Sequence, residues 1–303
     1  MSMATAHHPR ARAARRWVIV SALFVGFLGV MVLGPGPSKV EASNLFGGLR
    51  APGEAAFIAG HRGDRSVAPE NTMASMQAAL DGPMEFVEAD IQLTRDGIPV
   101  LLHDTFVNRT TNGSGRVGDL TLRELQELDA GSWYSPAFAR TRIPTLESLL
   151  SALQAKQAAG NAKKALLELK GYWSTGEVRI VTDLIADYGV GNLVIMSSFD
   201  LSTIDHLGEA DGTLPVAIIT SHLPNDPVGF ARLYGAMAII TSQSAVEGDL
   251  WVVDRMHRAG LGLVLYTLNT KSAWKNALAL GVDGVITDRP DRLDRWLLAA
   301  SEG

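Results

Sequence analysis

The stretch Phe86-Val87-Glu88-Ala89-Asp90-Ile91 places two carboxylates in a run of otherwise apolar residues. An apolar run of this length is typical of a buried β-strand, in which side chains two residues apart project from one face. Two like charges on one face repel each other and are costly to remove from water. We therefore predict that Glu88 and Asp90 end a buried strand and share a compensating cation, for which a divalent metal ion is the simplest choice.

A second apolar run, Ala165-Leu166-Leu167-Glu168-Leu169-Lys170, carries an acid and a base at the same spacing. Two histidines, His61 and His103, follow other short apolar runs and precede polar loops. The chain contains no cysteine, so that only oxygen and imidazole ligands remain for a metal ion. We predict a hard cation, Ca²⁺ or Mg²⁺, held by Glu88, Asp90 and Glu168.

Short apolar runs alternate with helical patterns over most of the chain. The predicted strands are 56–59, 85–91, 165–169, 193–196, 215–219, 236–240, 262–266 and 284–286, and the predicted helices are 72–80, 177–188, 250–258, 272–280 and 291–300. Eight such strands over about 250 residues are typical of a (β/α)₈ TIM barrel, although a doubly wound α/β sheet produces a similar pattern. Polar residues follow nearly every run, and polar groups gathered at the carboxyl ends of strands favour the barrel.

One segment interrupts this alternation after the second predicted strand. Thr94-Arg95-Asp96-Gly97 is a turn signal, and we predict that residues 99–102 return as an antiparallel partner of strand 85–91. Residues 104–144 then form a long excursion with a helix at 121–128, opened by Thr121 and Glu124. Because long loops in compact domains are usually functional, we expect an inserted cap over the active face of a barrel domain spanning 55–303.

Residues 1–42 have the composition of an export segment. Arginines at positions 10, 12, 15 and 16 precede an apolar run at 17–33, and Gly34-Pro35-Gly36-Pro37 breaks any helix that follows. The run is slightly long for a signal peptide and slightly short for a membrane span. We predict either a signal peptide cleaved after Ala42 or a retained membrane anchor. Either one places the rest of the protein outside the cytoplasm, secreted or attached to the membrane.

The chain carries 27 Lys and Arg against 32 Asp and Glu, and the basic residues outnumber the acids in residues 1–42. The remaining body is therefore acidic, which argues against nucleic acid as a partner. An anionic substrate has to be received by local cations. Arg62 and Lys170 are suited to neutralise a phosphodiester, while His61 and His103 can take up and deliver protons near neutral pH.

Four further polar residues allow more than one interpretation. Asn269 and Asp288 follow predicted strands and either line the site or tie loops together. We group Asn269 with Arg62 and Lys170 as a candidate for binding substrate. Glu70 and Asn71 precede the first predicted helix, where they either form only an N-capping turn or take part in the site.

Taken in order, these motifs resemble the glycerophosphodiester phosphodiesterase family, which is related to phosphatidylinositol-specific phospholipases C. The resemblance covers nearly the whole chain, from about residue 56 to 292. It rests on His61-Arg62-Gly63, Pro69-Glu70-Asn71-Thr72, Glu88-Ala89-Asp90, Thr94-Arg95-Asp96-Gly97-Ile98-Pro99-Val100, His103-Asp104, Ile143-Pro144-Thr145-Leu146, Glu168-Leu169-Lys170, Ser198-Phe199 and Asp283-Gly284-Val285-Ile286-Thr287-Asp288.

The resemblance implies a TIM barrel with an inserted cap and a divalent cation at Glu88, Asp90 and Glu168. It also implies catalytic histidines at His61 and His103, with His61 as the base and His103 as the acid, and phosphate contacts from Arg62 and Lys170. Members of the family cleave glycerophosphodiesters to glycerol phosphate and an alcohol, often described as attack by the substrate's own glycerol hydroxyl. Tyr266 stands where the family commonly has tryptophan, which affects the expected shape of the pocket wall.

Two other functions fit parts of this pattern. A phospholipase of the C or D type acting on intact lipids would need an exposed apolar rim around the barrel mouth, and the inserted segment shows no obvious apolar run. A non-catalytic barrel that only binds phosphodiesters could lose its proton carriers. This chain retains both histidines and all three carboxylates.

Overall fold

The computed structural model describes residues 41–249 and 251–301. The predicted signal peptide or anchor lies outside the described residues, apart from its last two positions. None of the helices in the described ranges combines the length and the apolar character that a membrane span requires.

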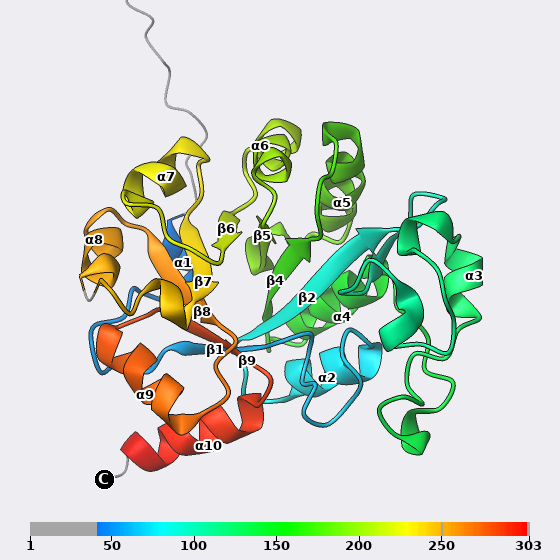
Figure 1. Ribbon diagram of the computed structural model, residues 1–303, viewed down its shortest axis with the longest axis horizontal. Helices are drawn as coiled ribbons and strands as arrows, with labels where there is room; N and C mark the ends of the chain where they lie inside the picture. The colour runs from blue at the N-terminus through cyan, green and yellow to red at the C-terminus, as the bar shows by residue number, and fades with distance from the viewer. Residues whose placement is uncertain (1–40, 250, 302–303) are drawn as a thin grey trace, which may run out of the picture. The chain divides into compact units, whose positions relative to one another are not determined.

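Eight parallel strands of the described chain form a closed barrel (Figure 1). Neighbouring strands pair in the order β1, β2, β4, β5, β6, β7, β8, β9, and β9 pairs again with β1. The closure confirms the barrel and excludes the open doubly wound sheet. The strands are β1 (Phe57–Gly60), β2 (Phe86–Leu93), β4 (Lys164–Leu169), β5 (Val194–Ser198), β6 (Val216–Thr220), β7 (Ala238–Ser242), β8 (Gly262–Tyr266) and β9 (Gly284–Thr287).

Helices cover the outside of the strands (Figure 1). They are α2 (Met73–Asp81), α4 (Leu146–Ala158), α5 (Thr175–Asp187), α6 (Leu201–Ala210), α7 (Pro227–Leu233), α8 (Val252–Arg258), α9 (Lys271–Leu280) and α10 (Pro290–Ser301). The predictions did not include α4, α6 or α7. Weak helix formers explain part of this, since α6 contains Ser, Thr, Asp and Gly and α7 begins at a proline. The side chains of Asp200 and Asp226 cap α6 and α7.

Side chains alternate along each strand between the barrel interior and the surrounding helices. On β2, Phe86 belongs to the interior cluster, whereas Val87 packs with the helices outside. Both faces are therefore buried, which explains why the strands are nearly continuous apolar runs. Glu88 and Asp90 follow Phe86 at two-residue intervals, so they point into the barrel near the carboxyl end of the strand.

A short helix, α1 (Ala42–Phe46), packs at the amino ends of the barrel strands and was not predicted. The ring of Phe46 lies 4.9 Å from that of Phe57, which in turn lies 4.4 Å from that of Phe86. A side chain at Gly262 would meet Phe46, so the residue that opens β8 has to be small. Ala42 is itself fully buried, and a chain cut after it would lose the first residue of this helix.

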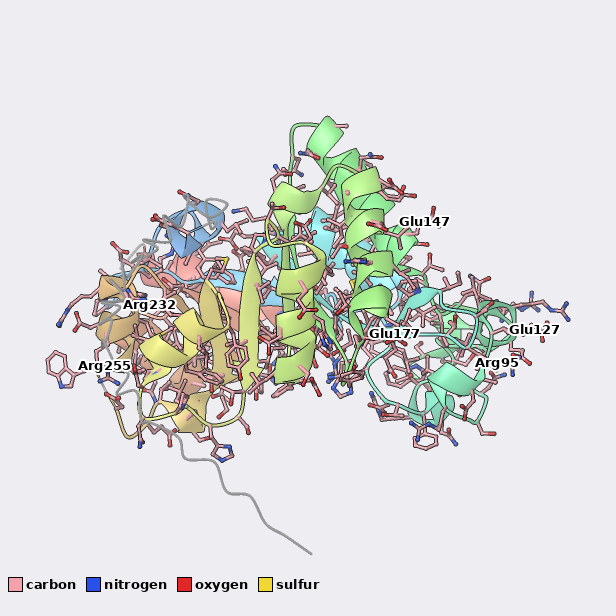
Figure 2. The ribbon with its side chains drawn as sticks, turned by 90° about the horizontal axis from the view of Figure 1, so that it is seen from above. Arg95, Glu127, Glu147, Glu177, Arg232 and Arg255 are labelled. Atoms are coloured by element: carbon pink, nitrogen blue, oxygen red, sulfur yellow. The ribbon has the colours of Figure 1, made fainter. Side chains whose placement is uncertain are left out.

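The predicted hairpin is confirmed: β3 (Pro99–Leu101) pairs antiparallel with β2, with Leu101 opposite Ile91. The following residues, 104–144, are called the inserted segment here. They form α3 (Leu122–Gln126) and the 3₁₀ turns η1 (Val107–Arg109), η2 (Val117–Asp119) and η3 (Pro136–Phe138) around a small apolar cluster of their own. Thr121 and Glu124 cap α3 reciprocally, as predicted. Figure 2 shows Arg95 and Glu127 among the elements on this side of the barrel.

Candidate active site

Three acidic side chains meet inside the barrel at the carboxyl ends of two neighbouring strands. Glu88 and Asp90 come from β2, and Glu168 comes from β4, where it lies directly opposite Asp90 in the sheet. Each offers a carboxylate oxygen within 4.8 Å of the others, and all three residues are buried. The structure therefore brings together the three predicted metal ligands.

The electrostatics of this cluster fit a bound cation. Burial, reinforced by the charges of Asp90 and Glu168, raises the pKa of Glu88 well above its ordinary value. Burial and Asp90 likewise raise the pKa of Glu168 to about 7. Burial would also raise the pKa of Asp90, but Lys170 and Arg62 outweigh it and lower the value. Three clustered oxygen ligands with excess negative charge are suited to a hard divalent ion such as Ca²⁺ or Mg²⁺.

The loop between β1 and α2 fixes the orientation of two of these acids. The side-chain amide of Asn71 donates to Oδ2 of Asp90 at 2.8 Å, and its oxygen accepts from the backbone N–H of Asp90 at 3.2 Å. The backbone N–H of Arg62 donates to Oε2 of Glu88 at 2.7 Å. Asn71 and Arg62 both have positive φ, of 52° and 57°, a conformation that costs free energy in residues other than glycine. This strained loop is built around the acidic cluster.

His61 follows β1 and pairs with a carboxylate from the neighbouring strand. Its Nδ1 lies 2.6 Å from Oδ1 of Asp288, which follows β9. Burial would raise the pKa of Asp288, but the hydrogen bond and charge of His61 lower it to about 2. Asp288 is therefore ionised and can accept a hydrogen bond from a protonated Nδ1 of His61. This leaves Nε2 of His61 as the nitrogen available to a substrate.

Asn269 supports this pair and does not line the cavity. Its Nδ2 donates to Oδ2 of Asp288 at 2.8 Å, and its Oδ1 accepts from the backbone N–H of Asp288 at 2.9 Å and from Oγ1 of Thr287 at 3.1 Å. These contacts use both ends of the amide. The structure therefore favours a role for Asn269 in tying loops together over a role in binding substrate.

His103 begins the loop after β3 and also pairs with a carboxylate. Its Nδ1 lies 2.7 Å from Oδ1 of Asp104. Burial lowers the pKa of His103, and this effect outweighs the nearby charge of Asp90. Both histidines thus engage a carboxylate through Nδ1 and line the same cavity as the acidic cluster.

Two cations stand beside the acids. Nζ of Lys170 lies 2.6 Å from Oε1 of Glu168 and 3.4 Å from Oδ1 of Asp90. Nε of Arg62 lies 3.3 Å from Oδ2 of Asp90. Burial alone would lower the pKa of Lys170, but Asp90 and Glu168 raise it, so the ammonium stays charged. Arg62 and Lys170 both line the cavity, as the prediction of phosphate contacts requires.

The cavity that these groups share has a volume of about 190 Å³. Apolar barrel residues close its floor: Leu166, Ile219, Ile240 and Ile286. Phe199 and Tyr266, whose rings meet edge to face at 6.0 Å, form part of its wall. A larger hollow of about 570 Å³ lies by α1 and α5, but none of the described residues that line it is a histidine, lysine or arginine. The smaller cavity is the candidate active site because it holds the groups that can carry chemistry.

Sequence reasoning missed a second layer of charged residues around the site. Glu70 was interpreted as part of an N-capping turn, but Thr72 caps α2 and the carboxylate of Glu70 binds three arginines instead. Arg65 and Arg109, which were not singled out, supply two of these contacts. Only Arg62 had been placed at the site, because the other two arginines lie in loops with no pattern of their own.

Comparison with known proteins agrees with this geometry. A model of the glycerophosphoryl diester phosphodiesterase family matches residues 61–292. The YhdW protein of Bacillus subtilis is 36% identical over 239 residues, which cover 78% of this chain and 95% of that protein. A glycerophosphodiester phosphodiesterase of Caldanaerobacter subterraneus is 31% identical over 239 residues, covering 78% of this chain and 96% of that protein.

Solved structures show the same likeness. A phosphodiesterase of Oleispira antarctica, determined in complex with the product sn-glycerol-3-phosphate, superimposes with a TM-score of 0.68 at 28% identity and covers 80% of this chain and 96% of that one. The family match extends over most of the barrel and all of its inserted segment. The chain belongs to the glycerophosphoryl diester phosphodiesterase family.

Proposed function

We propose that this protein is an exported, metal-dependent enzyme that hydrolyses glycerophosphodiesters to glycerol 3-phosphate and an alcohol. The observation that carries the proposal is one cavity lined by two histidine–carboxylate pairs, three clustered acids and two cations. The names of its relatives and the product bound to the Oleispira antarctica enzyme support the same substrate class.

Glu88, Asp90 and Glu168 would hold Ca²⁺ or Mg²⁺. When bound, a divalent ion there supplies positive charge to the phosphoryl oxygens as negative charge develops on them. Lys170 and Arg62 act in the same direction, since their side chains line the cavity and carry permanent charge at neutral pH.

The two histidines move protons at opposite ends of the scissile bond. Nε2 of His61 accepts the proton of the substrate's own glycerol hydroxyl, whose oxygen then bonds to phosphorus. The bond from phosphorus to the departing alcohol breaks, and Nε2 of His103 delivers a proton to that oxygen. Water then opens the cyclic phosphate with the two histidines in exchanged roles, which restores both to their starting states. The lowered pKa of His103 makes its protonated ring a stronger acid for the first step.

The remaining parts of the proposal concern the inserted segment and residues 1–42. Asp104 and Arg109, from the start of the inserted segment, contact His103 and Glu70 at the site. This supports a cap that completes the active face. Export, by a cleaved signal or a retained anchor, stays a prediction from the sequence of residues 1–42.

A second candidate is hydrolysis of intact lipids, for which an exposed apolar rim is the expected sign. Large apolar side chains in the inserted segment and in loops that follow barrel strands are exposed to solvent: Val67, Phe106, Trp133, Tyr172, Phe199 and Trp251. Phe199 also lines the cavity. Because exposed apolar side chains beside a cavity can receive acyl chains, the substrate panel has to include phospholipid vesicles. The non-catalytic alternative has no comparable support, since both histidines line the cavity.

The test uses the full-length chain in detergent with glycerophosphocholine, glycerophosphoethanolamine and phosphatidylcholine vesicles. His61→Asn and His103→Asn should each lower kcat on the favoured substrate by roughly 10²-fold or more. His222→Asn is the matched control, because His222 is exposed and its hydrogen bonds in the described structure are with its neighbour Ser221 and with Thr220. Near-normal turnover by either active-site variant would contradict the proposed roles.

A further inference from the structure

Glu70 is the centre of a charge network that reaches both histidines. Its side chain is only 2% exposed, and its carboxylate contacts three guanidinium groups among the described residues. Nη1 of Arg62 lies at 2.6 Å, Nη2 of Arg65 at 2.8 Å and Nη2 of Arg109 at 2.8 Å. Burial would raise the pKa of Glu70, but the hydrogen bond from Arg109 and the charges of Arg62 and Arg65 lower it. The carboxylate is thus a fixed anion.

Two of the arginines extend from Glu70 to the two histidine–carboxylate pairs. Arg65 spans from Glu70 to Oδ1 of Asp288, at 3.4 Å, and Asp288 holds His61. Arg109 spans from Glu70 to Asp104, which holds His103. One buried carboxylate therefore anchors both pairs through two separate arginines.

The link to Glu70 through an arginine matters more for His103 than for His61. His61 directly follows a barrel strand, and Asp288 is also held by Asn269. His103 follows β3, which lies outside the closed barrel, and the side chain of Asp104 is 32% exposed. In the described structure, the carboxylate of Asp104 contacts the side chains of His103 and Arg109.

The contact between Arg109 and Asp104 is bidentate. Nε of Arg109 donates to Oδ2 at 2.6 Å and Nη2 to Oδ1 at 3.1 Å, while Nη1 and Nη2 also bind the two oxygens of Glu70 at 3.1 and 2.8 Å. A planar guanidinium can span two carboxylates in this way, whereas a lysine ammonium cannot match the geometry. The plane of Asp104, and with it the direction of His103, is set by this bridge.

We propose that Arg109 is a positioning residue: from the inserted segment it bridges Glu70 and Asp104 and thereby aims His103 at the leaving-group oxygen. This inference rests on the proposed function, in which His103 protonates the departing alcohol. In the described structure, Arg109 is not part of the cavity lining and contacts Glu70 and Asp104 rather than the three clustered acids. Its loss should therefore weaken proton delivery and leave substrate binding largely intact.

The identity of the leaving group separates this role from a general structural one. A choline alkoxide is a poor leaving group and needs a proton, whereas p-nitrophenolate is a stable anion that leaves without one. Damage confined to proton delivery slows the first reaction and spares the second. Damage that only lowers the fraction of folded, active protein slows both equally, because the ratio of the two rates does not depend on that fraction.

The experiment compares glycerophosphocholine with the p-nitrophenyl ester of glycerol 3-phosphate in the wild type, Arg109→Met, Arg109→Lys, His103→Asn and Arg95→Met. Arg95→Met is the matched control, since Arg95 also ties the inserted segment down, through Glu124 and the carbonyl of Asp119 (Figure 2), but is not among the described residues that line the cavity. For Arg109→Met, kcat on glycerophosphocholine should fall roughly 10- to 100-fold with KM within about threefold.

On the p-nitrophenyl ester, the single-turnover rate of p-nitrophenolate release reports the first step alone. For Arg109→Met this rate should stay within about threefold of the wild type, and Arg109→Lys should resemble Arg109→Met. Arg95→Met should leave both rates unchanged. If His103→Asn discriminates between the two substrates and Arg109→Met does not, the inference is wrong and the proposed function stands. If His103→Asn slows the single-turnover release of choline and of p-nitrophenolate equally, His103 is not the acid, and the proposed roles fail together with the inference.

Discussion

The Nδ1 atom of His61 lies 2.6 Å from the Oδ1 atom of Asp288, across the ends of two neighbouring barrel strands. The two residues directly follow Gly60 and Thr287, which are paired in the sheet. Strand register therefore sets their separation, and the proton on Nδ1 is held by a carboxylate. This relationship makes Nε2 of His61 a proton acceptor, which is what the proposed first step requires.

Asp288→Asn should lower kcat by roughly 10²-fold or more, because an amide can donate to Nδ1 and so favour the tautomer that carries its proton on Nε2. Steady-state kinetics on glycerophosphocholine measures the change. Asp254→Asn is the control, since Asp254 forms a comparable but exposed pair with Arg258 on α8. A kcat within twofold of the wild type would show that Asp288 does not set the state of His61.

Asn71 should contribute both to stability and to cation affinity. Asn71→Ala loses two hydrogen bonds with Asp90 and replaces asparagine, which tolerates a left-handed backbone, with alanine, which does not. The free energy of unfolding should therefore fall by about 3 kcal/mol. Asn71→Gly loses the same bonds without the strain and should cost about 1 kcal/mol less. Urea unfolding measures both differences.

Both Asn71 variants should also bind Ca²⁺ or Mg²⁺ about tenfold more weakly, because the amide orients a carboxylate of the acidic cluster. Isothermal titration measures the affinity. Equal stability of the two variants would show that the backbone at Asn71 is not strained. Unchanged cation affinity would show that Asn71 does not orient the carboxylate of Asp90.

The raised pKa of Glu168 predicts a pH dependence of stability in the absence of metal. The folded protein keeps the proton of Glu168 up to about pH 7, whereas the unfolded chain releases it near pH 4.5. Stability should therefore fall as pH rises through this window, with a contribution of about 3 kcal/mol from this group. Urea unfolding with chelator at pH 5 and pH 8 measures the fall.

Glu168→Gln should remove that part of the fall, since glutamine does not titrate. Saturating Ca²⁺ or Mg²⁺ should also offset it in the wild type, because the cation binds the ionised carboxylate. The same loss of stability between pH 5 and pH 8 in the wild type and in Glu168→Gln would contradict the assignment.

The aromatic cluster of Phe46, Phe57 and Phe86 at the amino ends of the barrel strands should affect stability without affecting catalysis. Phe46→Ala removes a ring packed on Phe57 and Phe86 and should lower the free energy of unfolding by roughly 3 to 4 kcal/mol. Leu233→Ala, at a side chain that is 76% exposed, is the control and should change it by less than about 0.5 kcal/mol. Thermal unfolding and kcat are measured on the same samples. A loss of kcat in folded Phe46→Ala would show that this aromatic cluster is not independent of the active site.

The barrel and the strand-borne acids could be predicted because their signals are local. A two-residue spacing puts Glu88 and Asp90 on one face, and parallel pairing brings Glu168 opposite Asp90. Short elements were harder. The helix α1 has five residues and no side-chain cap, and it is held by packing of Phe46 against strands far along the chain.

The charge network around Glu70 could not be predicted, because its members share no periodic pattern. Glu70 and Arg109 are 39 residues apart and both lie outside regular strands. Asn269 shows the same limit: its position after a strand was recognised, but whether its amide faced the cavity or Asp288 depends on tertiary packing. Loop residues whose partners are distant require coordinates.

The most direct test of the central claim is the release of glycerol 3-phosphate from glycerophosphocholine by protein that has been stripped of metal. Glu88, Asp90 and Glu168 are proposed to hold the cation that the reaction requires. The stripped wild type should be inactive, Ca²⁺ or Mg²⁺ should restore turnover, and Asp90→Asn should not recover under the same conditions. Full activity of the stripped protein, or restoration of Asp90→Asn to wild-type turnover by the same cation, would contradict the account.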